Sequence, residues 1–172
     1  ITGKISGAEA LIRWRDPELG LIPPFDFIPL AEEIGLITHI TYWMLSEVCV
    51  QQKKWLDAGI SAVPVSVNLV AENFSDEKIV TEIQRVLDQN KLEARFLEVE
   101  LTESAAMTNA EQTITLLRAI REMGVLVAID DFGTGYSSLS YLEKFPIDIL
   151  KIDISFIREI LSNPHAVVIT SV

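Results

Sequence analysis

Apolar runs rich in β-branched residues alternate with amphipathic helical segments, and this alternation limits the available folds more than any other feature. Each run is short enough for one strand. From the second run onward the runs recur about every 20 to 35 residues, the period of a βα unit. Repeated βα units predict an α/β fold with a parallel sheet, closed as a barrel or left open. The expected strands are Ala8–Ile12, Val63–Val67, Phe96–Leu101, Val125–Ile129 and Ile147–Ile152.

Three segments between the expected strands keep apolar residues at helical spacing. The third should begin with a capping box formed by Thr108 and Glu111, and it should end at Gly124. The apolar positions of the three segments are Leu45, Val48, Cys49, Trp55 and Leu56, then Ile79, Val80, Ile83, Val86 and Leu87, and finally Ile114, Leu117 and Ile120.

Two adjacent carboxylates, Asp130 and Asp131, follow the apolar run "VLVAI" and precede a turn through Gly133 and Gly135. Adjacent carboxylates repel each other, so one of them should have a raised pKa unless a cation keeps both ionised. Either residue could instead only cap the turn, as aspartate often does. The pair therefore indicates a metal site or a turn cap.

Polar residues also fall near the ends of the other expected strands, where parallel α/β folds place their chemistry. Oxygen donors dominate, and no cysteine or histidine cluster occurs in the sequence, which favours Mg²⁺ or Mn²⁺ over zinc. His39 and His165 are assigned no role. The residues expected at this rim are Glu9, Asn68, Glu100, Asp130, Asp131 and Lys151.

Composition excludes several classes of protein. With 172 residues, 49% of them hydrophobic, the chain is long enough for a sizeable core. A net charge of −11 without a basic patch argues against binding a nucleic-acid polymer. The only cysteine, Cys49, should be a buried thiol, which suits a reducing compartment such as the cytoplasm. No run of about 18 apolar residues and no signal pattern occur, so no membrane contact by this segment is expected, although a longer parent could carry an anchor.

Five blocks of the sequence resemble the EAL-domain phosphodiesterases in order and spacing. The stretch "PELGLIPPFDFIPLAEEIGLI" also resembles the loop and helix that follow the EAL motif. The resemblance covers nearly the whole chain and implies a modified TIM barrel that hydrolyses the bacterial messenger cyclic di-GMP to linear pGpG. The five blocks are "EALIRW" from Glu9, "SVNL" around Asn68, "ELTES" from Glu100, "DDFGTGYSSLSYL" from Asp130 and "LKIDISFI" from Leu150.

The resemblance also implies roles for individual residues around two metal ions. Lys151 is expected to position the attacking water, and Glu103 to hold the DDFGTGYSS loop from behind. Arg13 should contact a substrate phosphate, and Asp153 should lie in the outer shell or touch substrate. The implied ligands of the first metal are Glu9, Asn68, Glu100 and Asp130, and Asp131 is implied for the second.

By the same resemblance, residues 1–172 should be an EAL domain truncated at both ends. A further metal-binding glutamate and a late glutamine of the family are not in the sequence, and at most six of eight barrel strands can be placed. Open sheet edges could pair with another chain, a second copy included. A fragment of a longer protein, with attached GGDEF or sensory domains, is the favoured interpretation.

Two other functions are compatible with these residues. A catalytically silent EAL domain would bind cyclic di-GMP as a receptor, but such receptors usually lose acids of the metal set, and here each acid within range is present. A glycoside hydrolase would use two strand-end carboxylates without a metal. Sensitivity to a chelator would separate the phosphodiesterase from the glycosidase.

Overall fold

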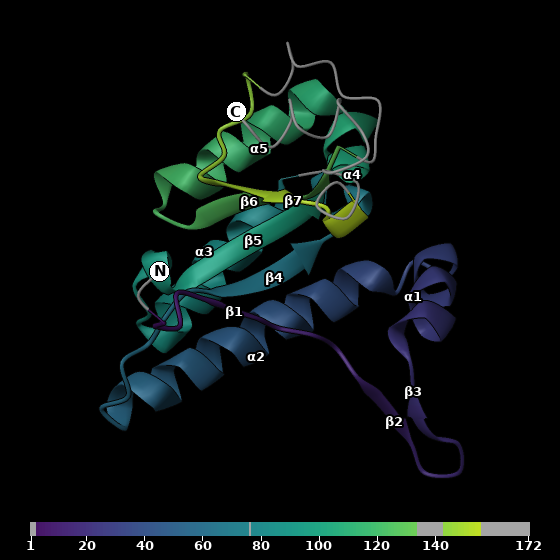
Figure 1. The fold of residues 1–172 in the computed structure, drawn as a ribbon, viewed down its shortest axis with the longest axis horizontal. Helices are drawn as coiled ribbons and strands as arrows, with labels where there is room; N and C mark the ends of the chain where they lie inside the picture. The colour runs from purple at the N-terminus through teal and green to yellow at the C-terminus, as the bar shows by residue number, and fades with distance from the viewer. Residues whose placement is uncertain (1–2, 76, 134–142, 156–172) are drawn as a thin grey trace.

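The computed structural model describes residues 3–75, 77–133 and 143–155. Within them, five parallel strands form one sheet in the spatial order β1, β4, β5, β6, β7 (Figure 1). The crossovers from β4 to β5 and from β5 to β6 pass through helices, as parallel pairing requires. The parallel α/β sheet predicted from the sequence is confirmed. The strands are β1 Ala8–Glu9, β4 Val65–Leu69, β5 Leu97–Thr102, β6 Leu126–Phe132 and β7 Ile149–Ile152.

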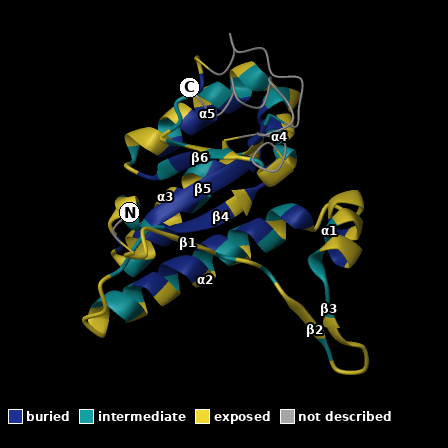
Figure 2. Cartoon of the chain, viewed as in Figure 1, coloured by how far each residue is buried: buried dark blue, intermediate teal, exposed yellow. Residues whose placement is uncertain are grey.

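The two faces of the sheet differ in chemistry because side chains alternate along each strand. On β4, Val65, Val67 and Leu69 join the hydrophobic core, whereas Ser66 and Asn68 point to the other face. The apolar face packs against the helices, and β5 and β6 continue it (Figure 2). We call the opposite, polar face of the sheet the inner face.

The helices cover the apolar face, and their buried sides follow the periodicity of the sequence. Cys49 on α2 is fully buried in this core. Although α2 has 21 residues, neither it nor another helix of the described residues could cross a membrane. The helices are α1 Pro24–Glu33, α2 Ile37–Asp57, α3 Lys78–Asn90, α4 Glu103–Thr108 and α5 Ala110–Glu122, with short 3₁₀ turns η1 Ala71–Phe74 and η2 Ala94–Phe96.

A small lobe outside the main sheet was not predicted as such. An antiparallel hairpin of β2 Trp14–Asp16 and β3 Gly20–Ile22 leads into α1 and lies beyond one end of α2 (Figure 1). The ring of Trp14 packs edge-on against Phe27 of α1, with 5.7 Å between ring centroids. The expected strand Ala8–Ile12 is correspondingly shorter, because the chain leaves the sheet after Glu9.

The capping box expected at Thr108 and Glu111 is wrong. Thr108 is the last residue of α4, and its hydroxyl donates to the carbonyl of Ser104. Asn109 separates α4 from α5 and makes no side-chain cap. The expected end of the helix is right, since Gly124 follows α5 with φ 93° and its N–H donates to the Arg121 carbonyl.

Candidate active site

The polar residues predicted for the strand ends do lie together along the carboxyl edge of the inner face. Asn68 of β4 is paired in register with Glu100 of β5, and Thr102 of β5 with Asp130 of β6. Residues paired in register on parallel strands point to the same face, so these side chains share one side of the sheet. The parallel topology therefore gathers donors that are far apart in the sequence.

Glu9 and Asn68 contact each other at this edge. The Asn68 side-chain amide donates a hydrogen bond of 2.8 Å to Glu9 Oε1, and both residues are exposed. This hydrogen bond uses the side-chain nitrogen of Asn68, so the side-chain oxygen is available to coordinate a cation. These two predicted ligands are thus brought together by the pairing of β1 with β4.

Glu100 is the most buried acid of the site, with 0% of its side chain exposed. No hydrogen bond from the described residues reaches either of its carboxylate oxygens, and the ammonium of Lys151 forms an ion pair with it. Lys151 comes from β7 and must reach across β6 to make this pair. Ala128 of β6, a small residue, is paired in register with Glu100 and with Ile149, which is two residues before Lys151.

Asp130 and Asp131 lie within β6 rather than after it. The register between β6 and β7 is irregular between Ile129 and Phe132, and Asp131 adopts φ 53° in the left-handed region. Such a bulge re-aims side chains at the end of a strand. Burial raises the pKa of the Asp131 carboxyl above its ordinary value, and the charges of Asp130 and Asp153 raise it further. The raised pKa expected for one acid of the pair is therefore found at Asp131.

Glu103 holds the chain directly after this bulge. It is the first residue of α4, it is 4% exposed, and its Oε2 accepts a 2.7 Å hydrogen bond from the Gly133 N–H. The cap of α4 is Thr102, whose hydroxyl accepts from the Ala105 N–H. Glu103 therefore faces inward toward the DDFG segment, while Gly135 and the rest of that loop lie outside the described residues.

Arg13 and Asp153 lie at the margins of the site. Arg13 donates to the carbonyl of Ile12 at 2.7 Å and lines, with Asn68, a cavity of about 230 Å³ between the lobe and the sheet. Asp153 follows β7, and its backbone N–H donates to the Phe132 carbonyl at 3.5 Å. Its side chain accepts from the Ser155 N–H at 2.8 Å. Both residues thus lie near the predicted ligands, and none of the hydrogen bonds named here joins either of them to a ligand.

The predicted ligands are carboxylate and amide oxygens, which are the ligand types that a hard divalent cation prefers. They surround the buried carboxylate of Glu100, which accepts no hydrogen bond from the described residues. In those same ranges, no group of three or more histidine, cysteine, aspartate or glutamate side chains has the spacing of a metal site. In this structure Lys151 supplies the positive charge at Glu100.

Two residues of the inner face, Ser66 and Glu98, were not predicted to lie near the site. They are paired in register one row below Asn68 and Glu100, and both are buried. They line, with Glu9 and Lys151, an inner-face cavity of about 430 Å³. The period of two in "FLEVELT" was the available signal, because it places Glu98 on the same face as Glu100.

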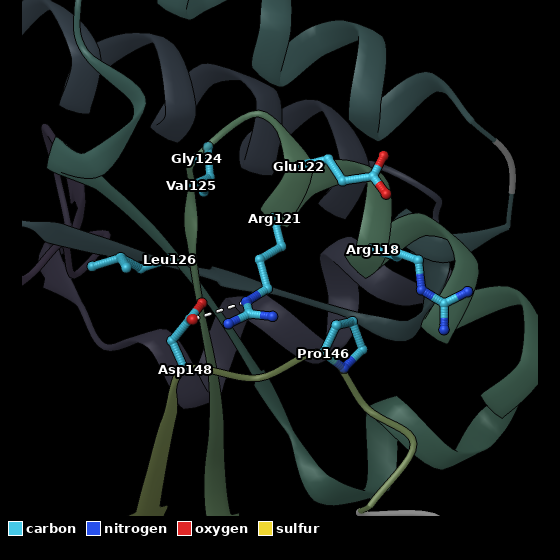
Figure 3. Close-up of a pocket in the computed structure, with 8 residues that line it drawn as sticks. All are labelled: Arg118, Arg121, Glu122, Gly124, Val125, Leu126, Pro146 and Asp148. Atoms are coloured by element: carbon cyan, nitrogen blue, oxygen red, sulfur yellow. Dashed lines mark hydrogen bonds and ion pairs between the residues drawn. The ribbon is translucent and has the colours of Figure 1, made fainter.

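A slightly larger cavity, of about 470 Å³, lies at the opposite, amino-terminal end of β6 (Figure 3). Arg121 there pairs with Asp148 at 2.8 Å, and Asp148 also accepts from the Val127 N–H. These charges neutralise each other and hold the start of β6 against the segment before β7. None of the described residues that line this cavity belongs to the predicted site.

Comparisons with known proteins identify the family to which the chain is similar. The family model of the EAL domain matches residues 1–172. The chain is 44% identical over 162 residues to cyclic di-GMP phosphodiesterase PdeR of Escherichia coli, covering 94% of this chain and 24% of that protein. It is also 44% identical over 169 residues to the bifunctional diguanylate cyclase/cyclic di-GMP phosphodiesterase MucR of Pseudomonas aeruginosa, covering 98% and 25%.

Solved structures give the same result for the fold. The PaMucR phosphodiesterase in complex with c-di-GMP superposes with a TM-score of 0.89 at 44% identity, covering 98% of this chain and 68% of that one. The chain itself spans about a quarter of the length of the two curated relatives.

Proposed function

Because the chain belongs to the EAL domain family and its parallel sheet is of that family's TIM-like (β/α) type, we propose that it is a phosphodiesterase domain that hydrolyses cyclic di-GMP. The observation that carries the proposal is the buried Glu100 carboxylate, with Asn68, Asp130 and Lys151 beside it at one edge of the sheet. The relatives are named for this activity, and a related domain has been solved with c-di-GMP.

The proposal includes dependence on Mg²⁺ or Mn²⁺, with two ions per site. Glu9, Asn68, Glu100 and Asp130 would hold the first ion, and Asp131 the second. When bound, such ions lower the pKa of a bound water and neutralise the phosphodiester. The chain has a net charge of −11, so an anionic substrate needs positive charge at this edge to approach.

The chain's own residues then supply binding, positioning and charge. Arg13 would contact a phosphate, and Asp153 would lie in the outer shell of the site. Lys151 would orient the attacking water and stabilise negative charge as it develops. Glu103 would fix the segment around Gly133 through its 2.7 Å hydrogen bond. Water adds to one phosphorus, the bond from that phosphorus to the ribose 3′ oxygen breaks, and linear pGpG is released.

The setting of the activity is part of the proposal. Cyclic di-GMP is a bacterial second messenger, so we place the reaction in the cytoplasm. A longer parent protein could combine this domain with a diguanylate cyclase domain, as the bifunctional name of MucR describes for that relative. Self-association through sheet edges is a further property to be measured.

The proposal is tested by incubating the chain with cyclic di-GMP and Mn²⁺, with and without a chelator, and separating the products by chromatography. We expect pGpG only with metal, and a loss of at least about a hundredfold in rate for Glu100→Gln. The control Glu93→Gln removes an exposed acid far from the site, which should leave the rate unchanged. Hydrolysis that survives the chelator would refute the proposal, and tight binding without hydrolysis would favour a receptor.

A further inference from the structure

Glu98 is a buried acid for which the proposed reaction has no use. It is 7% exposed and lies on the inner face, paired in register with Ser66 of β4 and Leu126 of β6. Within the described residues, no hydrogen bond or ion pair engages its carboxylate. Its side chain lines an inner-face cavity, and a carboxylate in this partly shielded position attracts a nearby positive charge.

Lys151 is the cation that faces Glu98. The two residues line the same inner-face cavity of about 430 Å³. Lys151 thus lies on the cavity that Glu98 lines, while its ammonium forms the ion pair with Glu100.

The strand geometry puts both carboxylates within reach of one lysine. Glu98 and Glu100 are two residues apart on β5, so they point to the same face with a rise of about 6.6 Å between them. Lys151 reaches Glu100 across β6, where the residue in register with Glu100 is the small Ala128, and a lysine has a flexible four-carbon stem. A swing of that stem would exchange one carboxylate for the other.

We propose that Glu98 is a positioning residue that receives the Lys151 ammonium when a divalent cation takes Glu100. This inference rests on the proposed function, because it needs the cation at Glu100. The cation would repel the ammonium and occupy its partner, and Glu98 is the acid in the same cavity that the proposed ligand set leaves unused. With Glu98, its charge stays in the cavity beside the site.

The test is Mn²⁺ binding measured by isothermal titration calorimetry, which needs no turnover. Glu98→Gln should weaken Mn²⁺ binding about fivefold, because the ammonium then stays near the ion. In the Lys151→Met background the same substitution should change the affinity by less than about twofold. Glu122→Gln, an exposed acid at the other end of the sheet, is the control for net charge and should change neither value.

Equal weakening in both backgrounds would show that Glu98 acts on the ion directly and would overturn the inference, as would no weakening in either. Failure of the proposed function can be told apart from failure of this inference. If no metal binds at Glu100, Glu100→Gln would also leave Mn²⁺ binding unchanged. Thermal melting checks that each variant folds. If Glu98→Gln does not fold, Glu98→Asp keeps the charge on a shorter side chain, and it should give a smaller loss that also requires Lys151.

Discussion

The ion pair between Lys151 and Glu100 allows a sharp prediction, because one partner is fully buried and the other is about one-third exposed. Lys151→Met keeps an unbranched side chain that is one atom shorter and removes the charge, which leaves Glu100 without its cation. Removing one partner of a fully buried pair costs about 3–5 kcal/mol. Since 35% of the Lys151 side chain is exposed, water screens the pair from one side, and we expect about 1–3 kcal/mol.

The assay is urea unfolding of the parent and the variant in a chelator and again in saturating Mn²⁺. For a chain of this size the expected penalty corresponds to a fall in Tm of about 2–12 °C. In Mn²⁺ the penalty should fall below about 0.5 kcal/mol, because the metal replaces the lost ammonium at Glu100. The control is Lys53→Met, which breaks an exposed pair with Asp57 and should cost at most about 0.5 kcal/mol.

Two outcomes would refute this reasoning. If Lys151→Met cost no more than Lys53→Met in the chelator, the buried carboxylate would not depend on the lysine for its charge balance. If the penalty stayed the same in Mn²⁺, the metal would not bind at Glu100, and the set of ligands proposed above would be wrong.

Three further predictions concern other parts of the fold. Gln52→Leu should destabilise the chain by about 2–4 kcal/mol in urea unfolding, because the buried Gln52 amide donates to two backbone carbonyls at 2.7 and 2.9 Å; the exposed Gln84→Leu is its control. Gly133→Ala should cost about 1–2 kcal/mol, since its φ of 100° suits glycine alone, whereas Gly7→Ala meets only an ordinary contact and should cost little. The pKa of Asp131 is raised in the folded chain, so the unfolded chain ionises first and, without metal, the folded chain should lose stability as pH rises above the ordinary value of 3.8. In a chelator, Asp131→Asn should abolish this loss, and below that pH it should leave stability unchanged.

The strands could be predicted from sequence because their signal is local. Runs such as "VLVAI" are apolar and β-branched, and the structure places a strand at each of the five predicted runs. The β2–β3 hairpin was not predicted because each of its strands has only three residues. Its turn did leave a signal, since Asp16 accepts from the N–H groups of Glu18 and Leu19, which is a common use of aspartate.

The edge of the sheet at which the candidate site residues lie could be predicted from sequence, but the contacts between their side chains could not. Acids at strand ends identify an edge, and the topology then brings Asn68 next to Glu100. The bulge at Asp131 depends on the register between β6 and β7, which is a property of two distant segments. The ion pair of Lys151 likewise spans the intervening strand β6, and nothing local to Lys151 shows that Glu100 lies within its reach.

The single cysteine gives the molecule a built-in probe of its own opening. Cys49 is fully buried in the core beneath the sheet, and burial raises the pKa of its thiol to about 12. A thiol reagent can therefore modify it only through transient exposure of α2, so the modification rate at low reagent concentration reports the equilibrium between closed and open chains. A cysteine introduced elsewhere on the surface would react first and could be labelled selectively without removing the native one.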